Sequence, residues 1–333
     1  MDARQTLAVV VPAYNEGEGL RQFHARLTPV FDALSDLDCR VIYVDDGSRD
    51  DTWSVIESLA AADPRAAGLK LSRNFGKELA MTAGLDHADA DAVVVIDADL
   101  QDPPELIPAF IAKWREGFDA VYGTREVREG ETWLKTLTAH LFYRVMDKLS
   151  STPIPRDTGD FRLLSRRAVE ALRGIRERHR FMKGLFTWVG FRQVALPYRR
   201  DPRHSGTSKF NYWKLWNFAL EGITSFSSAP LRIATYLGVA TAVFAFAFGV
   251  WIVLKTLLWG DAVPGYPSLM VVILFLGGVQ LMALGIIGEY LGRLYEESKA
   301  RPLYLIDRWQ PARDGHAAPI GDLRAVSTGL SSR

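Results

Sequence analysis

The sequence predicts an α/β domain with a mostly parallel sheet covered by helices on both faces, followed by two membrane-spanning helices. Between Leu7 and Tyr122, short apolar runs alternate with segments whose apolar residues recur at helical spacing. This alternation is typical of parallel sheets in which each strand is followed by a helix. Between Leu231 and Gly292, by contrast, charged residues almost disappear. A chain of 333 residues has room for a large domain and such a membrane hairpin.

Each strand is predicted from an apolar run that ends at turn-forming residues, and each helix from apolar residues three or four positions apart. Pro104 also suits the first turn of a helix. In chain order we expect strands at Leu7–Val11, Val41–Val44, Gly68–Leu71, Ala92–Ile96 and Asp119–Tyr122, and helices over Leu20–Leu34, Val55–Leu59, Glu78–His87 and from Pro104.

Two uncharged runs, Ile233–Leu254 and Ser268–Gly288, predict the membrane spans. Each is long enough to cross roughly 30 Å of hydrocarbon as a helix. Core helices of a soluble protein can also be apolar, but they rarely keep this length without a charge. We therefore expect spans within residues 231–258 and 268–292.

Basic residues beside the spans predict their orientation. Arg232 precedes the first span and Arg293 follows the second, whereas the loop between them carries only Asp261 as a charge. By the positive-inside rule, both termini then lie in the cytoplasm. The run Leu7–Val11 is too short for a signal peptide. We expect a protein of the inner (plasma) membrane with a cytoplasmic domain over 1–209 and a cytoplasmic tail over 293–333, whose end is mobile.

Composition excludes several function classes. Lys and Arg number 40 and Asp and Glu 39, a formal net charge of +1, so the basic excess of a nucleic-acid-binding protein is missing. A single cysteine, Cys39, excludes an intramolecular disulfide and a zinc site built from several thiolates. The chain has no GxxxxGK[ST] loop, and no GxGxxG follows its first strand, so a P-loop NTPase or a dinucleotide oxidoreductase is not expected.

Acidic side chains follow three of the predicted strands, in the segments Pro12–Glu16, Asp45–Ser48 and Asp97–Asp102. The carboxyl ends of parallel strands meet at one edge of a sheet, where such sheets bind ligands. Asp and Asn also favour turns and helix N-caps, which remains an alternative for Asp45 and Asp50. The pair Asp97 and Asp99, with Gln101 nearby, suits Mg²⁺ or Mn²⁺ bridging a substrate diphosphate.

These segments resemble a known family. VVPAYNEGEGL, VDDGSRDDTW, LSRNFGKELAMTAGL and VVVIDADLQDPPE are similar to the family-2 inverting glycosyltransferases with the GT-A fold. DTGDFRLLSR and RHSGTSKF, followed by two spans, narrow the resemblance to polyprenyl-phosphate glycosyltransferases, the group of bactoprenol glucosyltransferases and dolichol-phosphate mannose synthases. The resemblance covers residues 7 to about 295 and implies a Rossmann-like GT-A domain, a nucleotide-sugar donor and a polyprenyl phosphate acceptor.

The resemblance also implies roles for individual residues on the donor side. One group of residues would line the nucleotide pocket or contact the base and ribose. A second group, near the sugar and diphosphate, would hold a metal ion or contact the donor. For Arg73 and Lys77, the alternative to contacting the donor is to be solvated cations of a loop. The nucleotide pocket would comprise Pro12, Tyr14, Glu16, Val44 and Asp46; the sugar and metal side Asp97, Ala98, Asp99 and Gln101; and the further donor contacts Arg73 and Lys77.

On the acceptor side, Arg125, Arg203 and Lys209 would bind the lipid phosphate, since Arg can grip a phosphate with two hydrogen bonds. Nonspecific attraction of anionic lipids is the alternative. Aromatic residues over 210–230, including Trp213 and Trp216, predict an interfacial amphipathic helix rather than core.

Asp157 matches a family aspartate often assigned as the catalytic base. A polyprenyl monophosphate has a second pKa of about 6, so near neutral pH it is already nucleophilic and needs no strong base. We therefore expect Asp157 to orient Arg203, Lys209 or the acceptor phosphate, with Asp160 as the less favoured substitute. A capping role for Asp157 is the alternative. A single in-line displacement, with a metal stabilising the departing diphosphate, would invert the anomeric carbon.

Glucose from UDP-glucose is the donor we favour, because the two-span layout and ITSFSSAPLR resemble the bactoprenol glucosyltransferases. Mannose, N-acetylated sugars and modified arabinose stay open, and relatives suggest a homo-oligomer such as a tetramer. A processive polysaccharide synthase is the second enzyme hypothesis, although the sequence has no QxxRW motif. A nonenzymatic membrane scaffold that binds nucleotide sugars is the third.

Overall fold

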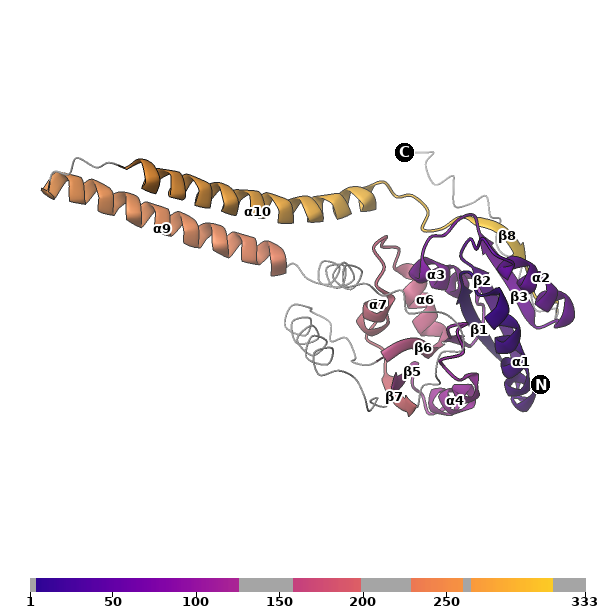
Figure 1. The fold of residues 1–333 in the computed structure, drawn as a ribbon. Helices are drawn as coiled ribbons and strands as arrows, with labels where there is room; N and C mark the ends of the chain where they lie inside the picture. The colour runs from indigo at the N-terminus through magenta and orange to yellow at the C-terminus, as the bar shows by residue number, and fades with distance from the viewer. Residues whose placement is uncertain (1–3, 126–157, 199–228, 260–264, 314–333) are drawn as a thin grey trace, which may run out of the picture. The chain divides into compact units, whose positions relative to one another are not determined.

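The structure, a computed structural model, describes residues 4–125, 158–198, 229–259 and 265–313. These residues fall into two units, a sheet-containing unit that includes 302–313 and a helical hairpin within 229–301 (Figure 1). The predicted aromatic helix over 210–230 lies outside the described residues except for its last two positions.

The described part of the sheet-containing unit holds eight strands in one sheet, in the order β7-β5-β6-β4-β1-β2-β3-β8. Neighbours pair in parallel from β4 through β1 and β2 to β3 and between β5 and β7, whereas β6 and β8 run antiparallel to their neighbours. The mostly parallel sheet expected from the sequence is therefore confirmed. The strands are β1 (Gln5–Ala13), β2 (Leu37–Asp45), β3 (Ala66–Leu71), β4 (Ala92–Val95), β5 (Ala120–Arg125), β6 (Thr158–Ser165), β7 (Gln193–Tyr198) and β8 (Ile306–Gln310).

Helices cover both faces of this sheet. Apolar residues of α1, α2 and α4 join the core cluster with Leu7, Val9 and Val11 of β1. Alternate residues of β1 point to the other face, where Val10 lies directly against α3, because a Cβ at Gly84 of that helix would approach the Val10 side chain. The helices are α1 (Gly17–Ala33), α2 (Thr52–Ala62), α3 (Lys77–His87), α4 (Ile107–Arg115) after the 3-10 turn η1 (Pro104–Leu106), α6 (Arg166–Gly174) and α7 (Met182–Trp188).

All five strands predicted from the sequence are present, each with bounds that overlap its predicted range. The helix expected from Pro104 begins instead as a 3-10 turn and becomes α-helical at Ile107. The strands β6, β7 and β8 were not predicted. In β6 both polar and apolar residues are buried. Its sequence therefore shows neither a continuous apolar run nor an alternation of polar and apolar residues, the two patterns that predict a strand.

Strand β8 returns the chain to the sheet after the hairpin. It pairs antiparallel with β3, with Leu69 opposite Trp309. Residues around it add further contacts: the Tyr304 hydroxyl donates to Asp86 Oδ2 at 2.8 Å, and the Arg313 amide donates to the Pro64 carbonyl at 2.8 Å. The segment after the hairpin is therefore part of the sheet-containing unit.

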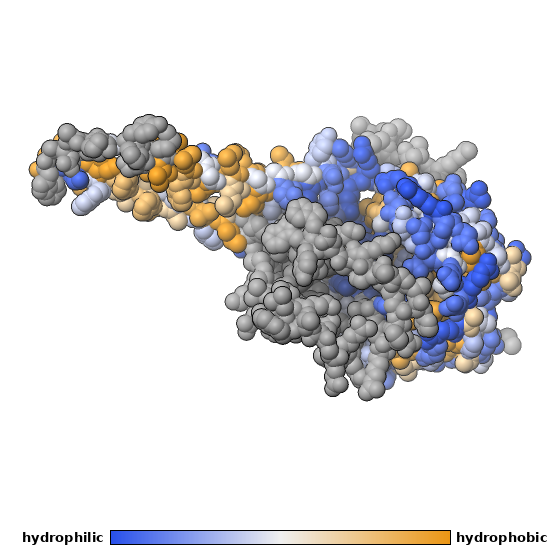
Figure 2. Space-filling model, viewed as in Figure 1, coloured by the Kyte–Doolittle hydropathy of each residue, from blue (hydrophilic) through white to orange (hydrophobic). Residues whose placement is uncertain are grey.

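The hairpin unit consists, in its described residues, of α9 (Ala229–Trp259) and α10 (Tyr266–Ser298), which lie side by side (Figure 1). Leu231–Ile252 and Val271–Ser298 are long and apolar enough to cross a membrane. At most 6 % of the most apolar window of either helix is buried, and Figure 2 shows their hydrophobic surface. Exposed apolar surface of this extent suits lipid rather than water.

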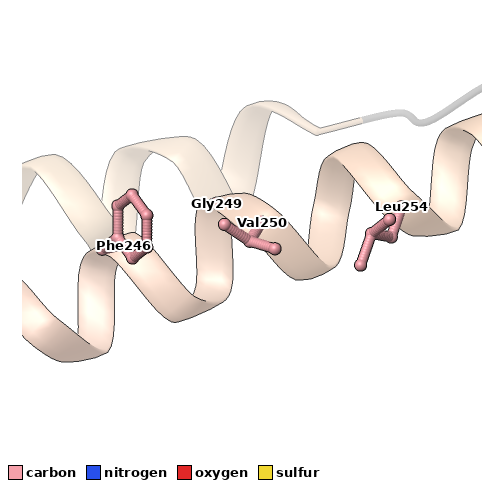
Figure 3. A pocket seen from close by; sticks show the side chains of 4 residues that line it. All are labelled: Phe246, Gly249, Val250 and Leu254. Carbon is pink, nitrogen blue, oxygen red and sulfur yellow. The ribbon is translucent and has the colours of Figure 1, made fainter.

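A shallow apolar recess lies on α9, lined by Phe246, Gly249, Val250 and Leu254 (Figure 3). These side chains offer no charge or hydrogen-bonding group, so the recess suits hydrocarbon and not a polar substrate.

Removal of β8 is expected to weaken the sheet-containing unit. A chain that ends at Arg301 loses the pairing with β3 and the bonds of Tyr304 and Arg313, each worth about 1 kcal/mol. Thermal unfolding in detergent should show a lower midpoint than for the full chain. A chain that ends at Arg313, which keeps β8, is the matched control and should unfold at a higher midpoint than the chain that ends at Arg301. Equal midpoints for the two truncated chains would contradict the stabilising role of β8.

Candidate active site

The acidic segments predicted from the sequence meet at one edge of the sheet. Ala13 at the end of β1 pairs with Asp45 at the end of β2, and β4 ends beside them two residues before Asp97. Because β6 runs antiparallel to β4, its first residues, among them Asp160, begin at this same edge. The carboxyl ends of the parallel strands and the start of β6 thus bring these carboxylates together.

Lys77, the first residue of α3, joins carboxylates from two strands. Its ammonium donates to Asp97 Oδ2 at 2.8 Å and to Asp160 Oδ2 at 2.5 Å. Burial disfavours the ammonium, but the two carboxylates outweigh it and raise the pKa of Lys77 well above its usual value. The Lys77 side chain keeps 43 % of its surface exposed, so water screens part of this attraction. In this cluster of three, Lys77 thus lies as a cation between two acidic side chains.

Asp160 is ionised at neutral pH. Burial would raise its pKa, but Lys77, Lys183 and Arg162 together hold the pKa of Asp160 well below its usual range. Its Oδ1 is buried and has no hydrogen-bond partner among the described residues. A carboxylate with so low a pKa is a weak proton acceptor, which argues against Asp160 as a strong general base.

Two further ionisable side chains, which were not predicted, lie beside this cluster. Glu78 accepts a hydrogen bond from the Met182 amide at 3.1 Å, and burial with the nearby Asp160 raises the pKa of Glu78 to about 7. Arg162 lies 3.7 Å over the ring centroid of Phe186, and burial lowers its pKa to about 10, so it stays protonated. A signal for both existed, since Glu78 follows Lys77 and Arg162 lies in the DTGDFR motif.

On the nucleotide side, a turn after β1 is fixed against the turn after β2. The Asn15 amide donates to Ser48 Oγ at 3.0 Å, and the Glu16 amide donates to Thr52 Oγ1 at 2.9 Å. Pro12 and Val44, both predicted to line the nucleotide pocket, are paired in register and buried.

Tyr14, in the same turn, is 42 % exposed. Its ring is therefore accessible to a nucleotide base, as the predicted pocket requires.

Both carboxylate oxygens of Asp46 accept hydrogen bonds from the loop that follows β3. Oδ1 accepts from the Phe75 amide at 2.7 Å, and Oδ2 from the Gly76 amide and the Asn74 side chain, each at 2.9 Å. Burial nevertheless raises the pKa of Asp46. The structure gives Asp46 a part in holding the loop before Lys77, and its contact with base or ribose stays a prediction.

Gly47 follows Asp46 with φ of +65°, and a Cβ there would lie 2.3 Å from the Arg73 backbone. Only glycine therefore lets the two loops approach this closely. Arg73 itself is exposed, with its guanidinium 4.0 Å over the Phe75 ring, so its positive charge is accessible from solvent.

The predicted metal ligands form a short turn after β4. The Gln101 amide donates to Asp99 Oδ1 at 3.1 Å, Leu100 has φ of +58°, and Ala98 is buried. Carboxylate and amide oxygens are the hard ligands that Mg²⁺ and Mn²⁺ prefer, so the residues present fit such an ion. Among the described residues, no three His, Cys, Asp or Glu side chains are arranged to hold a metal alone. Oxygens of a substrate would have to complete the coordination.

The predicted acceptor residues are tested only in part. Arg125 ends β5 at the same edge of the sheet, but nothing is described of its side chain. Asp157, Arg203 and Lys209 lie outside the described residues, so their roles stay predictions.

Two family descriptions match the chain. Residues 8–173 match "Glycosyl transferase family 2", and residues 229–294 match "GtrB C-terminal hairpin". The first match covers the strands and loops of the site described above, and the second covers α9 and most of α10.

Similar proteins extend over nearly the whole chain. A Synechocystis protein named as an uncharacterized glycosyltransferase is 53 % identical over 91 % of this chain and 95 % of its own. The bactoprenol glucosyl transferase of Shigella phage SfV is 49 % identical over 90 % of this chain and 97 % of its own. Among solved structures, glucosyl-3-phosphoglycerate synthase from Mycobacterium tuberculosis, in complex with Mn²⁺, UDP and phosphoglyceric acid, matches with a TM-score of 0.46. It is 22 % identical over 66 % of this chain and 76 % of that one.

Glu78 is expected to make stability depend on pH. Its pKa is about 7 in the folded protein against 4.5 as the usual value, so between these values the folded state binds more protons than the unfolded state. Stability therefore falls as pH rises through this window, by at most about 1.4 kcal/mol per pH unit. Glu78→Gln keeps an oxygen for the Met182 amide and removes this dependence.

The measurement is thermal unfolding in detergent at several pH values between 4.5 and 7. The variant should gain stability relative to the wild type as pH rises. Glu105→Gln is the matched control, because the ion pair with Arg26 outweighs burial and lowers the pKa of Glu105. A constant difference between Glu78→Gln and the wild type across the window would refute the assignment.

Proposed function

The chain belongs to the polyprenyl-phosphate glycosyltransferase group of glycosyl transferase family 2, and on this premise we propose that it transfers a sugar from a nucleotide diphosphate sugar to a polyprenyl monophosphate. Glucose from UDP-glucose is the proposed donor. Its support is that relatives matching about nine-tenths of the chain are named bactoprenol glucosyl transferases. The product would be a polyprenyl-phosphate sugar.

The observation that carries this proposal is the cluster of Lys77, Asp97 and Asp160. It lies where parallel strands end, next to a turn with further hard oxygen ligands in Asp99 and Gln101. Asp97, Asp99 and Gln101 offer oxygen ligands for a divalent ion and Lys77 offers positive charge, which are the groups that a site for a diphosphate and its metal ion needs.

Asp97, Asp99 and Gln101 would hold Mg²⁺ or Mn²⁺. When bound, the ion would stabilise the negative charge that grows on the departing nucleoside diphosphate. Two carboxylates and one amide leave coordination positions for diphosphate oxygens, which is how Mg²⁺ commonly binds to phosphate substrates.

Side chains of the protein would bind the base and the diphosphate of the donor. Tyr14 and Glu16 would flank the base, and the exposed guanidinium of Arg73 would attract the diphosphate. Lys77 donates hydrogen bonds to both Asp97 and Asp160 and so lets the two carboxyl groups lie side by side, which like charges alone would resist.

The acceptor phosphate is the nucleophile. With a second pKa of about 6 it is largely a dianion at neutral pH, so the enzyme has to hold and orient it more than deprotonate it. We propose that Arg125, Arg203 and Lys209 bind it and that Asp157 orients these groups. Attack in line with the departing diphosphate inverts the anomeric carbon, so an α-linked donor gives a β-linked product.

Pairing of β8 with β3 supports the proposed membrane topology. One strand precedes the hairpin and the other follows it, so a single folded sheet requires both on the same side of the membrane. Two crossings by α9 and α10 satisfy this requirement. The basic residues beside the spans then favour the cytoplasm for the sheet-containing unit and both termini. We also propose a homo-oligomer, such as a tetramer.

A donor panel tests the function. Purified protein in detergent, a polyprenyl phosphate and Mg²⁺ are incubated with UDP-glucose, UDP-N-acetylglucosamine, GDP-mannose and a modified arabinose donor. Mass spectrometry of the extracted lipid should find one hexose added from UDP-glucose. Polymeric product would favour a processive synthase instead, and donor binding without any lipid product would favour a nonenzymatic scaffold.

Loss of the metal site should abolish transfer. EDTA in excess is expected to stop the reaction, and Mg²⁺ or Mn²⁺ should restore it. Asp99→Asn should lower kcat by about 100-fold or more, the scale of removing a group that stabilises charge in the transition state. Asp36→Asn, on an exposed Asp paired with Arg115, is the control and should keep full activity. Undiminished transfer in EDTA would exclude a metal-dependent mechanism.

The pH dependence separates an orienting Asp157 from a base. If acceptor ionisation controls the rate, kcat/KM of the wild type rises with an apparent pKa of about 6. Asp157→Asn should then lower kcat/KM at every pH and keep the shape of this profile. A ratio of variant to wild-type kcat/KM that climbs back toward one at high pH would instead assign proton removal to Asp157.

A further inference from the structure

Tyr198 and Asp102 form a buried hydrogen bond between the end of β7 and the turn that carries the proposed metal ligands. The Tyr198 hydroxyl donates to Asp102 Oδ1. Tyr198 is 5 % exposed and Asp102 is fully buried. Asp102 directly follows Gln101, whereas Tyr198 is far away along the chain, so the bond fixes a short turn to a distant strand.

The ring of Tyr198 has little freedom to move. It meets the Phe161 ring edge-on, with centroids 6.1 Å apart and an interplanar angle of 86°. On another side it lies against Gly123 of β5, where an added Cβ would come within 2.6 Å of the ring. Glycine at 123 thus leaves the space that the ring occupies, and the hydroxyl is held in one place.

We propose that Tyr198 and Asp102 are positioning residues that fix the turn Asp97–Asp102 in its metal-binding form. This inference rests on the proposed function, since it takes Asp97, Asp99 and Gln101 as metal ligands. Leu100 within the turn has φ of +58°, an unfavourable conformation for a bulky residue. Such a conformation persists where the surroundings over-determine it.

Several contacts hold this turn, besides the bond from Lys77 to Asp97 described above. Leu100 is 3 % exposed and packs into the core cluster, Asp99 accepts the bond from the Gln101 amide, and Asp102 accepts the bond from Tyr198. The bond from Tyr198 reaches outside the turn through a polar group at the Asp102 end, as the bond from Lys77 does at the Asp97 end. The Tyr198 bond holds Asp102, the residue next to Gln101.

The pair also connects the two halves of the site. Tyr198 is the register partner of Arg125 in the parallel pairing of β7 with β5. The bond thereby ties the turn Asp97–Asp102 to the ends of β5 and β7. Arg125, one of the predicted acceptor residues, is the last residue of β5. Tyr198 and Asp102 need not touch substrate to have this effect.

The test compares two buried tyrosines. Tyr198→Phe removes the hydroxyl and keeps the ring. Tyr43→Phe is the matched control, because Tyr43 is fully buried and its hydroxyl contacts His24 at 2.8 Å, in another part of the sheet. Mn²⁺ binding to the full chain with UDP, in detergent and without acceptor, is measured by electron paramagnetic resonance. Tyr198→Phe should bind Mn²⁺ about 10-fold more weakly, the scale seen when a partner of metal ligands is lost. Tyr43→Phe should bind like the wild type.

A second measurement needs no metal. Hydrogen exchange of a peptide covering Asp97–Pro104 in the ligand-free protein should be faster in Tyr198→Phe and unchanged in Tyr43→Phe. Asp102→Asn keeps an oxygen that can accept from Tyr198 and should lose less Mn²⁺ affinity than Tyr198→Phe. Gly123→Ala, which displaces the ring but keeps its hydroxyl, should weaken Mn²⁺ binding as Tyr198→Phe does and serves if that variant does not fold.

If Tyr198→Phe and Gly123→Ala both keep wild-type Mn²⁺ affinity and wild-type hydrogen exchange, this inference is overturned and the proposed function is not. An equal loss in Asp102→Asn and Tyr198→Phe would also overturn it, because the charge of Asp102 and not the bond would then matter. Absence of Mn²⁺ binding in the wild type would overturn both this inference and the metal-dependent part of the proposed function.

Discussion

The ammonium of Lys77 between Asp97 and Asp160 is the interaction on which the site depends. Asp97 follows the end of β4 and Asp160 lies near the start of β6, and the opposite directions of these neighbouring strands bring both to the same edge. Two such anions in a partly buried place repel each other, and the cation makes their proximity stable. Removing one partner of such a cluster is far more damaging than the net stability it contributes, because the remaining charges lose their counterion. Arg162 adds a further cation beside Asp160, and Glu78 adds a carboxyl group whose pKa is raised to about 7.

Local signals suffice for the half of the sheet that carries the donor site. The apolar run of β1 and the helical spacing of α1 lie within a few residues of one another, so the sequence alone predicts them. The rule that parallel strands end at one edge then brings the segment after β1, Asp45 and Asp97 together, and the structure confirms this convergence. For Asp46 the sequence could predict its place but not its use, since both its oxygens bind a loop that lies about thirty residues further on.

Partners distant in sequence explain what could not be predicted. In β6, Asp160 and Arg162 are buried, which a polar strand permits only because Lys77 from α3 and Phe186 from α7 lie against them. No sequence pattern within β6 predicts those partners. Strand β8 is short, half exposed and separated from β3 by the whole hairpin, so its pairing is a long-range event without local pattern. The bond of Tyr198 to Asp102 belongs to the same class.

The late position of β8 in the chain sets an order of assembly. A ribosome completes β3 long before it reaches Ile306, and both α9 and α10 are synthesised in between. Until then the outer edge of the nascent sheet offers unpaired backbone groups, a template for aggregation. The edge can close only once α9 and α10 have been synthesised, so the sheet is completed by residues that follow the whole hairpin.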